Sequence, residues 1–158
     1  MGQADSSTIT NCYNTGSVSG DSSAVGGVVG CASSSTITNC YNTGSVSGSS
    51  TAGGVVGYAY ESDIANCYNT GSVSGSSPAG GVVGDANNTT IENCYNTGPV
   101  TGSDWYTGGV VGHATASSTI TNCYNTGAVT GDRYGGGVVG NATASSTITN
   151  CYNTGAVT

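Results

Sequence analysis

The cysteines are the most regularly spaced reactive residues in the sequence. Six of them occupy the second position of a recurring string, N-C-Y-N-T-G, whose copies begin 28, 27, 27, 29 and 28 residues apart. Such a series could bind zinc or form disulfides, but zinc requires four converging ligands, and no C-x-x-C pair is present. The spacing instead predicts a row of small, buried thiols and no metal site. The row consists of Cys12, Cys40, Cys67, Cys94, Cys123 and Cys151.

A tyrosine follows each of these cysteines, and an asparagine precedes it. Successive side chains of a strand point to opposite faces, so the tyrosines are predicted to stack as an outward row. This row would support the fold, and it could also bind sugar rings. The asparagines are predicted to bond their side-chain amides along the row. The two rows are Tyr13, Tyr41, Tyr68, Tyr95, Tyr124 and Tyr152, and Asn11, Asn39, Asn66, Asn93, Asn122 and Asn150.

Two loops depart from the repeat in a way that is typical of recognition surfaces. Where one unit has Ser-Ser-Thr at 49–51, later units place Trp105 and Tyr106, and then Arg133 and Tyr134. Exposed Trp, Tyr and Arg are enriched at binding hot spots, and variable loops carry function. We interpret these four residues as a candidate ligand-binding site. The alternative is that they cover an open corner of the fold.

The remaining titratable residues do not form a catalytic pattern. His113 is the only histidine, and its position in the repeat varies freely, which indicates a surface side chain. Glu61, Asp63 and Glu92 could approach one another as a carboxylate pair or a weak calcium site, but scattered acids are usually solvated. We therefore expect no catalytic residue and no cofactor, and a polysaccharide-cleaving enzyme is disfavoured because one Arg and no Lys are present.

Charge and hydrophobic content further limit the classes of partner that the chain can bind. The formal net charge is −7 with Arg133 as the single base, and phosphate backbones and anionic membranes require clustered Lys and Arg. No apolar run approaches the roughly 20 residues needed to cross a bilayer. With 35% hydrophobic residues, 28 Gly and no Phe, the chain lacks material for an ordinary core. Nucleic acid and membrane insertion are therefore not expected.

The repeat itself determines the elements that position these residues. A second string, G-G-V-V-G, recurs five times between copies of the first, and periods of 20 to 50 residues indicate solenoids. Segments 36–41, 45–47 and 54–59 have strand character, with turn residues between them. The sequence predicts an all-β, three-sided parallel β-solenoid, right-handed, of about 5.5 coils of 27–29 residues. Residues 1–7 are expected to be a leader, and residues 8–158 a single domain with coils starting near 8, 36, 63, 90, 119 and 147.

In such a stack, equivalent residues lie about 4.8 Å apart and form ladders. One isoleucine and one valine per unit are predicted to fill the core, as Ile37 and Val46 do in the second unit. Strand alternation directs Val55 to one face and Val56 to the other, so the Val56 ladder should face solvent or a partner unless a bend turns it inward. Disulfides along the cysteine row would need local distortion, because Cβ atoms about 4.8 Å apart exceed the usual separation of about 3.8 Å. Whether the row is reduced or bridged stays open.

At these residues the sequence resembles the GLUG-motif family of repeats in large bacterial surface proteins, with N-C-Y-N-T-G and the segment Gly27 to Gly30 carrying the match. Valine replaces the usual leucine. The resemblance covers nearly the whole chain and transfers no catalytic residue. It implies an extracellular spacer or adhesion region, a fragment of a larger cell-surface protein.

These observations together predict a noncatalytic structural or adhesive module. The chain begins and ends within a repeat, so its terminal coils are expected to expose strand edges and to stack end to end into filaments. A host glycan or protein is a further possible partner. The alternatives are a carbohydrate-binding adhesin segment and an ice-binding solenoid, because Thr-x-Thr pairs such as Thr36 and Thr38 recur. Asp63, Ala65 and Glu92 interrupt those threonine rows.

Overall fold

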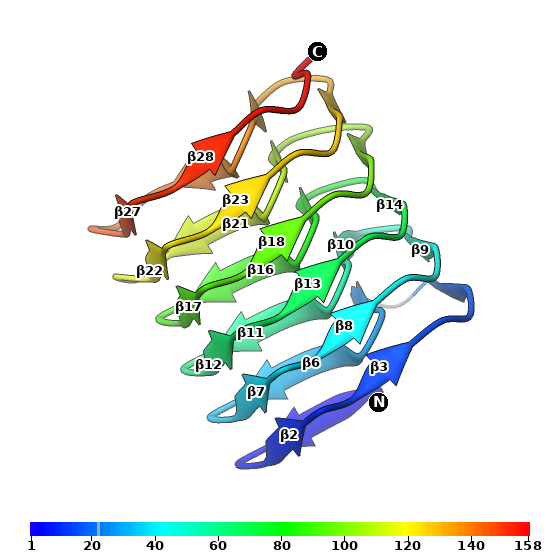
Figure 1. The fold of residues 1–158 in the computed structure, drawn as a ribbon, viewed down its shortest axis with the longest axis vertical. Coiled ribbons are helices and arrows are strands. Elements are labelled where there is room, and N and C mark those ends of the chain that lie inside the picture. Colours follow the sequence, from blue (N-terminus) through cyan, green and yellow to red (C-terminus); the bar gives the residue numbers. More distant parts are fainter. Residues whose placement is uncertain (22) are drawn as a thin grey trace.

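The computed structural model describes residues 1–21 and 23–158. It is a parallel β-solenoid of about five turns, stacked from the N-terminal coil (blue) to the C-terminal coil (red) in Figure 1. The described residues contain strands and turns but no helix, and thus no helix that could cross a membrane. The all-β solenoid prediction is confirmed.

Each complete coil contributes one strand to each of five sheets, which we name A to E. Sheet A contains β1 (Gln3–Asp5), β6 (Val29–Ser33), β11 (Val56–Tyr60), β16 (Val83–Asn87), β21 (Val111–Thr115) and β26 (Val139–Ala142). Sheet B contains β2 (Thr8–Thr10), β7 (Thr36–Thr38), β12 (Asp63–Ala65), β17 (Thr90–Glu92), β22 (Thr119–Thr121) and β27 (Thr147–Thr149). Sheet C contains β3 (Tyr13–Asn14), β8 (Tyr41–Asn42), β13 (Tyr68–Asn69), β18 (Tyr95–Asn96), β23 (Tyr124–Asn125) and β28 (Tyr152–Asn153).

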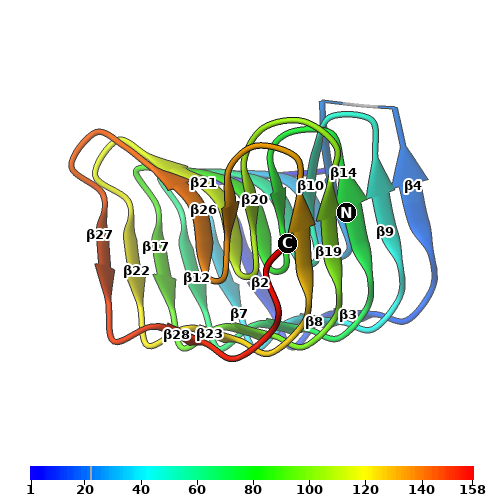
Figure 2. The same ribbon diagram turned by 90° about the horizontal axis from the view of Figure 1, so that it is seen from above.

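The two remaining sheets are shorter. Sheet D contains β4 (Val18–Gly20), β9 (Val46–Gly48), β14 (Val73–Gly75), β19 (Val100–Gly102) and β24 (Val129–Gly131). Sheet E contains β5 (Ala24–Gly26), β10 (Thr51–Gly53), β15 (Ala79–Gly80), β20 (Thr107–Gly108) and β25 (Gly135–Gly136). Sheet E contacts both sheet D and sheet A, and Figure 2 shows its strands inside the outline of the coil. All five sheets are parallel and keep equivalent repeat positions in register.

The prediction of three strand segments per coil is wrong in two places. The segment 36–41 divides into β7 and β8, because Asn39 takes a left-handed conformation with φ of 54° and turns the chain. Asparagine tolerates this conformation better than other residues with a side chain. The segment after β9, expected to be only a corner, contains β10, whose Ala52 is fully buried.

The expected leader at residues 1–7 includes part of the solenoid. Strand β1 pairs in parallel with β6, matching Ala4 with Ala32, and Ala4 is buried in the core. Residues 3–5 therefore extend sheet A, and the solenoid starts before residue 8.

The buried side chains form two separate clusters. The larger one joins the Val and Ala side chains of sheet A to the isoleucines of sheet B and the cysteines that precede sheet C. The smaller one lies between sheets D and E and contains Val46, Val73 and Val100. Both predicted core ladders are confirmed for the inner coils, where Ile64 and Val73 are each 1% exposed.

The second valine of G-G-V-V-G lies inside the core. Val55 and Val56 are both fully buried, and in each case the backbone N–H donates to the same carbonyl, that of Val82. Two amides sharing one acceptor is the mark of a β-bulge, which breaks the alternation of side chains. The Val56 ladder therefore faces inward, which is the outcome that the prediction reserved for a bend in the strand.

Candidate functional site

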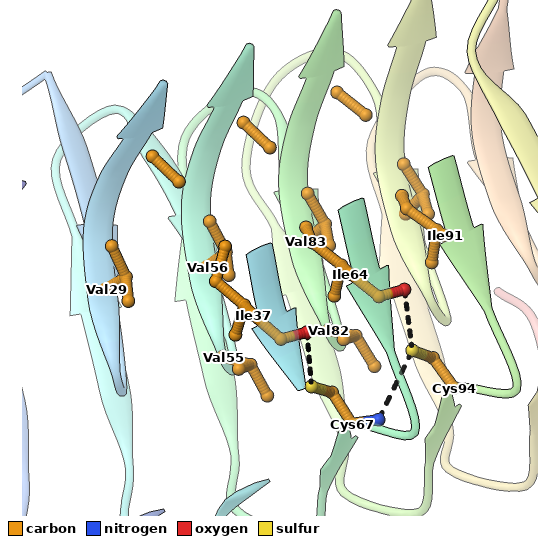
Figure 3. Close-up of a cluster of buried hydrophobic side chains, with 14 of the residues drawn as sticks. Val29, Ile37, Val55, Val56, Ile64, Cys67, Val82, Val83, Ile91 and Cys94 are labelled. Carbon is orange, nitrogen blue, oxygen red and sulfur yellow. Dashed lines mark hydrogen bonds between the residues drawn. The ribbon is translucent and has the colours of Figure 1, made fainter. Parts of the chain in front are cut away.

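The cysteines form a column along the inner edge of the core. Cys40, Cys67, Cys94 and Cys123 are fully buried, whereas Cys12 in the first coil is exposed and Cys151 is half-buried. Figure 3 shows how the column is bonded: the Cys67 Sγ donates to the carbonyl of Ile37 at 3.6 Å, and the Cys67 N–H donates to the Cys94 Sγ at 3.4 Å. The sulfur contacts therefore join each coil to its neighbours.

All seven cysteines are free in the structure, and the described residues hold no group of metal-ligating side chains. Hydrogen bonds with the Cys123 and Cys67 thiols, together with burial, raise the pKa of Cys94. Burial also raises the pKa of Cys151. The same hydrogen bonds act in the opposite direction on the partners: those with Cys40 and Cys94 lower the pKa of Cys67 to about 4, and that with Cys94 lowers the pKa of Cys123. The inner thiols are fully buried, so they are packed away from solvent and from any soluble reactant.

The tyrosines stack face to face on the outer surface of sheet C. Ring centroids of neighbouring tyrosines lie 4.9 to 5.2 Å apart, and their planes differ by 2° to 7°. Tyr13 and Tyr152 at the two ends are 63% and 55% exposed, while the inner rings are half-buried. Each inner ring therefore uses both faces on its neighbours and presents only its edge to solvent.

The amide column is built by the second asparagine of N-C-Y-N, not by the first. Asn96 is fully buried, and its Nδ2 donates to the Asn125 Oδ1 at 2.8 Å and to the Gly98 carbonyl at 2.7 Å. Equivalent bonds link all six coils through Asn14, Asn42, Asn69, Asn96, Asn125 and Asn153. The first asparagines, predicted to form this column, instead have positive φ at the turn before each cysteine. Within the described residues, one hydrogen bond joins their amides, from the Asn122 Nδ2 to the Asn93 Oδ1 at 3.3 Å.

The two sequence strings depend on each other through this column. A Cβ on Gly54, the second glycine of G-G-V-V-G, would overlap the carbonyl oxygen of Gly81 and the side chain of Asn69. The same is true of Gly81 with Gly109 and Asn96. The asparagine column can therefore form only where glycine lets the backbone of sheets E and A approach it.

The four predicted binding residues come together on the loops between sheets D and E. The Trp105 ring stacks on Tyr134 at 5.8 Å between centroids, and Tyr106 lies 5.6 Å from Tyr134. The Arg133 Cζ lies 4.4 Å from the centre of the Trp105 ring, a cation–π contact worth about 0.5–1 kcal/mol at an exposed site. Trp105 and Tyr134 remain 38% and 52% exposed. We call these four residues the aromatic cluster.

Two residues that sequence reasoning set aside adjoin the aromatic cluster. The His113 ring stacks on Tyr106 at 4.6 Å, and its Nδ1 lies 3.3 Å from the Asp85 Oδ1. That oxygen is buried and accepts no hydrogen bond of good geometry within the described residues. Tyr58 lies next to Asp85 at the same repeat position of the preceding coil. Burial and the negative charge of Asp85 raise the pKa of Tyr58. The cluster thus continues as a polar strip along sheet A.

The register of the repeat is the sequence feature from which this strip could have been predicted. Tyr58, Asp85 and His113 occupy one repeat position in consecutive coils, so a solenoid must place them side by side. Their variability indicated a surface position, but it gave no indication of the stacking on Tyr106, which depends on the path of the loop. The acids considered as a pair are not opposite each other, because Asp63 pairs with Thr90, and Glu92 with Ala65.

The model of the GLUG motif matches the chain four times, at residues 21–47, 48–74, 103–130 and 131–158. No curated protein matches the chain. The matched segments comprise more than two thirds of the residues, and the stretch between them, 75–102, folds into the same strands in the same register. The chain therefore belongs to the GLUG-motif family.

Proposed function

We propose that the chain is a noncatalytic structural and adhesive module of an extracellular surface protein, a stiff rod that associates end to end. The observation that supports this most is the in-register repetition of every interior contact. Isoleucine, cysteine and asparagine columns run through all the coils, and each inner coil is held on both sides by backbone and side-chain bonds. Such a fold suits a spacer, because its length can change by whole coils without changing its cross-section.

Both end faces of the rod have strand edges with which a further coil can pair. Strands β2 and β27 are the outermost strands of sheet B, and each has a single strand neighbour. At the C-terminal face the ladder residues Ile148 and Val157 are 41% and 42% exposed, whereas their equivalents in inner coils are buried. Either face accepts one further coil, from the same chain or from a second copy. Because the contact is head to tail, it continues without closing.

Sedimentation velocity over a concentration series, with electron microscopy of the same samples, tests the association. We expect the 158-residue chain to form thin filaments one coil wide. The double variant Ile148→Lys with Val157→Lys should weaken association at least tenfold, because it adds charge to the apolar end face. The matched control Ser74→Lys with Thr101→Lys adds the same charge to exposed positions of inner coils and should associate normally. A chain that stays monomeric at every concentration overturns the proposal.

Ice binding has a weaker basis in the structure. Threonines in register occupy both outward positions of β7 and β22, which gives a regular hydroxyl array on parts of sheet B. Asp63, Ala65 and Glu92 interrupt it in the two middle coils. We therefore rank this function second, and an absence of thermal hysteresis is the expected result.

A further inference from the structure

We infer that the aromatic cluster, together with Asp85 and His113, binds a neutral oligosaccharide. This inference names a ligand for the adhesive role proposed above. The cluster lies outside the ladders that build the rod, and it is confined to two neighbouring coils. A repeat that served only as a spacer would have no use for Trp105 and Arg133, the single tryptophan and the single base of the chain.

The chemistry of the cluster matches the two sides of a sugar ring. A pyranose has an apolar face of C–H groups and a rim of hydroxyls. Trp105 and Tyr134 stack on each other and Arg133 lies over the Trp105 ring, yet the two aromatic residues stay 38% and 52% exposed, so the ring surface left outside these contacts is apolar and has little conformational freedom to lose. Arg133 supplies donors, the 25%-exposed Asp85 side chain supplies an acceptor through the oxygen other than the buried Oδ1, and His113 can provide both. Sites that bind small molecules combine such surfaces in this way.

Charge favours a neutral ligand over an acidic one. Asp104 and Asp132 lie in the same two loops as Trp105 and Arg133, and Asp85 lies at the edge of the cluster. With a net charge of −7 on the whole chain, the field around the cluster repels uronic acids, sulfated sugars and phosphates. The guanidinium of Arg133 is already engaged on the Trp105 ring. It is therefore suited to bond hydroxyls at the edge of that ring.

The surroundings of the cluster favour a sugar over a protein. A stable protein partner covers roughly 800 Å² on each side with an apolar centre. Beyond the rings and Arg133, the two loops carry only Ser103 and the aspartates, and the nearby outward positions of sheet D are Ser and Thr. In the tyrosine column, which could also have served as a sugar platform, the inner rings use both faces on their neighbours at 4.9 Å and are half-buried, whereas Trp105 and Tyr134 stay 38% and 52% exposed despite their mutual stacking. The aromatic cluster is the better platform.

Trp105 makes the test direct, because the fluorescence of the only tryptophan reports on the site itself. The intact chain is titrated with cellohexaose, chitohexaose, mannohexaose and, as the acidic probe, a galacturonic acid oligomer. We expect at least one neutral probe to shift or quench the emission to saturation, and the acidic probe to bind at least tenfold more weakly. Tyr134→Ala, which keeps the reporter and changes an exposed residue, should weaken binding about tenfold. Trp105→Ala is a second variant, and its binding is measured by calorimetry because the substitution removes the fluorescent reporter.

The matched control is Tyr60→Ala, which removes a tyrosine of 39% exposure outside the cluster and should bind normally. The inference is overturned if no neutral probe binds, if the acidic probe binds more tightly, or if Tyr134→Ala and Tyr60→Ala have equal effects. Sedimentation of the same samples separates this result from the proposed association. Loss of sugar binding with normal filaments refutes the ligand alone, and normal binding to monomeric rods refutes the filament alone.

Discussion

Asn96 illustrates how the interior of the rod depends on the asparagine column. It is fully buried, gives two hydrogen bonds through Nδ2, and accepts others from Asn69 at 2.8 Å and from the Gly98 N–H at 3.2 Å. Removal of this amide leaves buried polar partners unsatisfied. Residues such as this are unremarkable in sequence, since both asparagines of N-C-Y-N recur equally. Only the position of Asn96 inside the coil distinguishes it from Asn93.

We expect Asn96→Ala to lower the free energy of unfolding by about 3 kcal/mol, because each orphaned group costs about 1–3 kcal/mol. Chemical denaturation followed by circular dichroism measures the change. Thr97→Ala, at the exposed neighbouring position, is the control and should stay within about 0.5 kcal/mol. Equal effects of the two changes would contradict a structural role for the amide column.

The thiol of Cys94 predicts a dependence of stability on pH. Hydrogen bonds with the Cys123 and Cys67 thiols, and burial, hold its folded pKa well above the ordinary value. A raised folded pKa means that the unfolded chain loses the proton first, so its stabilising effect is complete below about pH 8.5 and falls as pH rises further. We expect the contribution of Cys94, measured with reductant present as the difference in free energy of unfolding between the unsubstituted chain and Cys94→Ala, to decrease from about pH 8 to about pH 9.5. A difference that does not change with pH would refute the assignment.

At the level of single strands, the β-bulge in G-G-V-V-G decides where its valines go. Alternation alone placed Val83 on the surface, as it did for the equivalent Val56, whereas both Val82 and Val83 are fully buried. The bulge is a pattern of backbone hydrogen bonds and requires no particular residue type. The sequence pattern therefore could not predict its position. By contrast, the single apolar residue between polar ones in sheets B and D, such as Ile37 and Val73, was correctly predicted to lie in the core.

Val83→Lys tests the bulge directly. An inward lysine would bury an unpaired charge, so we expect this variant not to fold, with loss of the strand signal in circular dichroism and rapid proteolysis. Asn87→Lys, on the same strand at a partly exposed position, should fold and change stability by about 1 kcal/mol or less. If Val83→Lys folded normally, the second valine would have to face solvent.

At the scale of the whole molecule, the repeat made the solenoid predictable while leaving its cross-section undetermined. Two sequence strings that recur at a fixed period required stacked parallel coils. The strand register then followed from aligning the copies of the repeat, and Ile64 does pair with Ile37. The fifth sheet was missed because β15 and β20 contain only two residues each, too few for any periodicity. The four residues of the aromatic cluster were found because their types break the repeat. His113 and Asp85 were missed because their contacts depend on the loop path.

Removal of one whole coil should preserve the fold. Deletion of residues 63–89 joins residue 62 to Thr90, which occupies the same register position as Asp63. Because each coil contacts mainly its neighbours, we expect the shortened chain to keep its strand content per residue, with a lower denaturation midpoint. Deletion of residues 63–75 removes half a coil, disrupts the register, and should prevent folding. Similar behaviour of the two deletions would contradict a one-dimensional stack.

The asparagine column gives the rod a dipole along its axis. In all five links the Nδ2 atom donates toward the coil that follows, so the amides point the same way. Aligned amide dipoles add, as they do along a helix, whereas the backbone dipoles of a sheet largely cancel. The column is therefore positive at Asn153 and negative at Asn14. An anion is stabilised near the first of these residues and a cation near the second, so the two ends of the rod differ in chemistry although their coils share one sequence pattern.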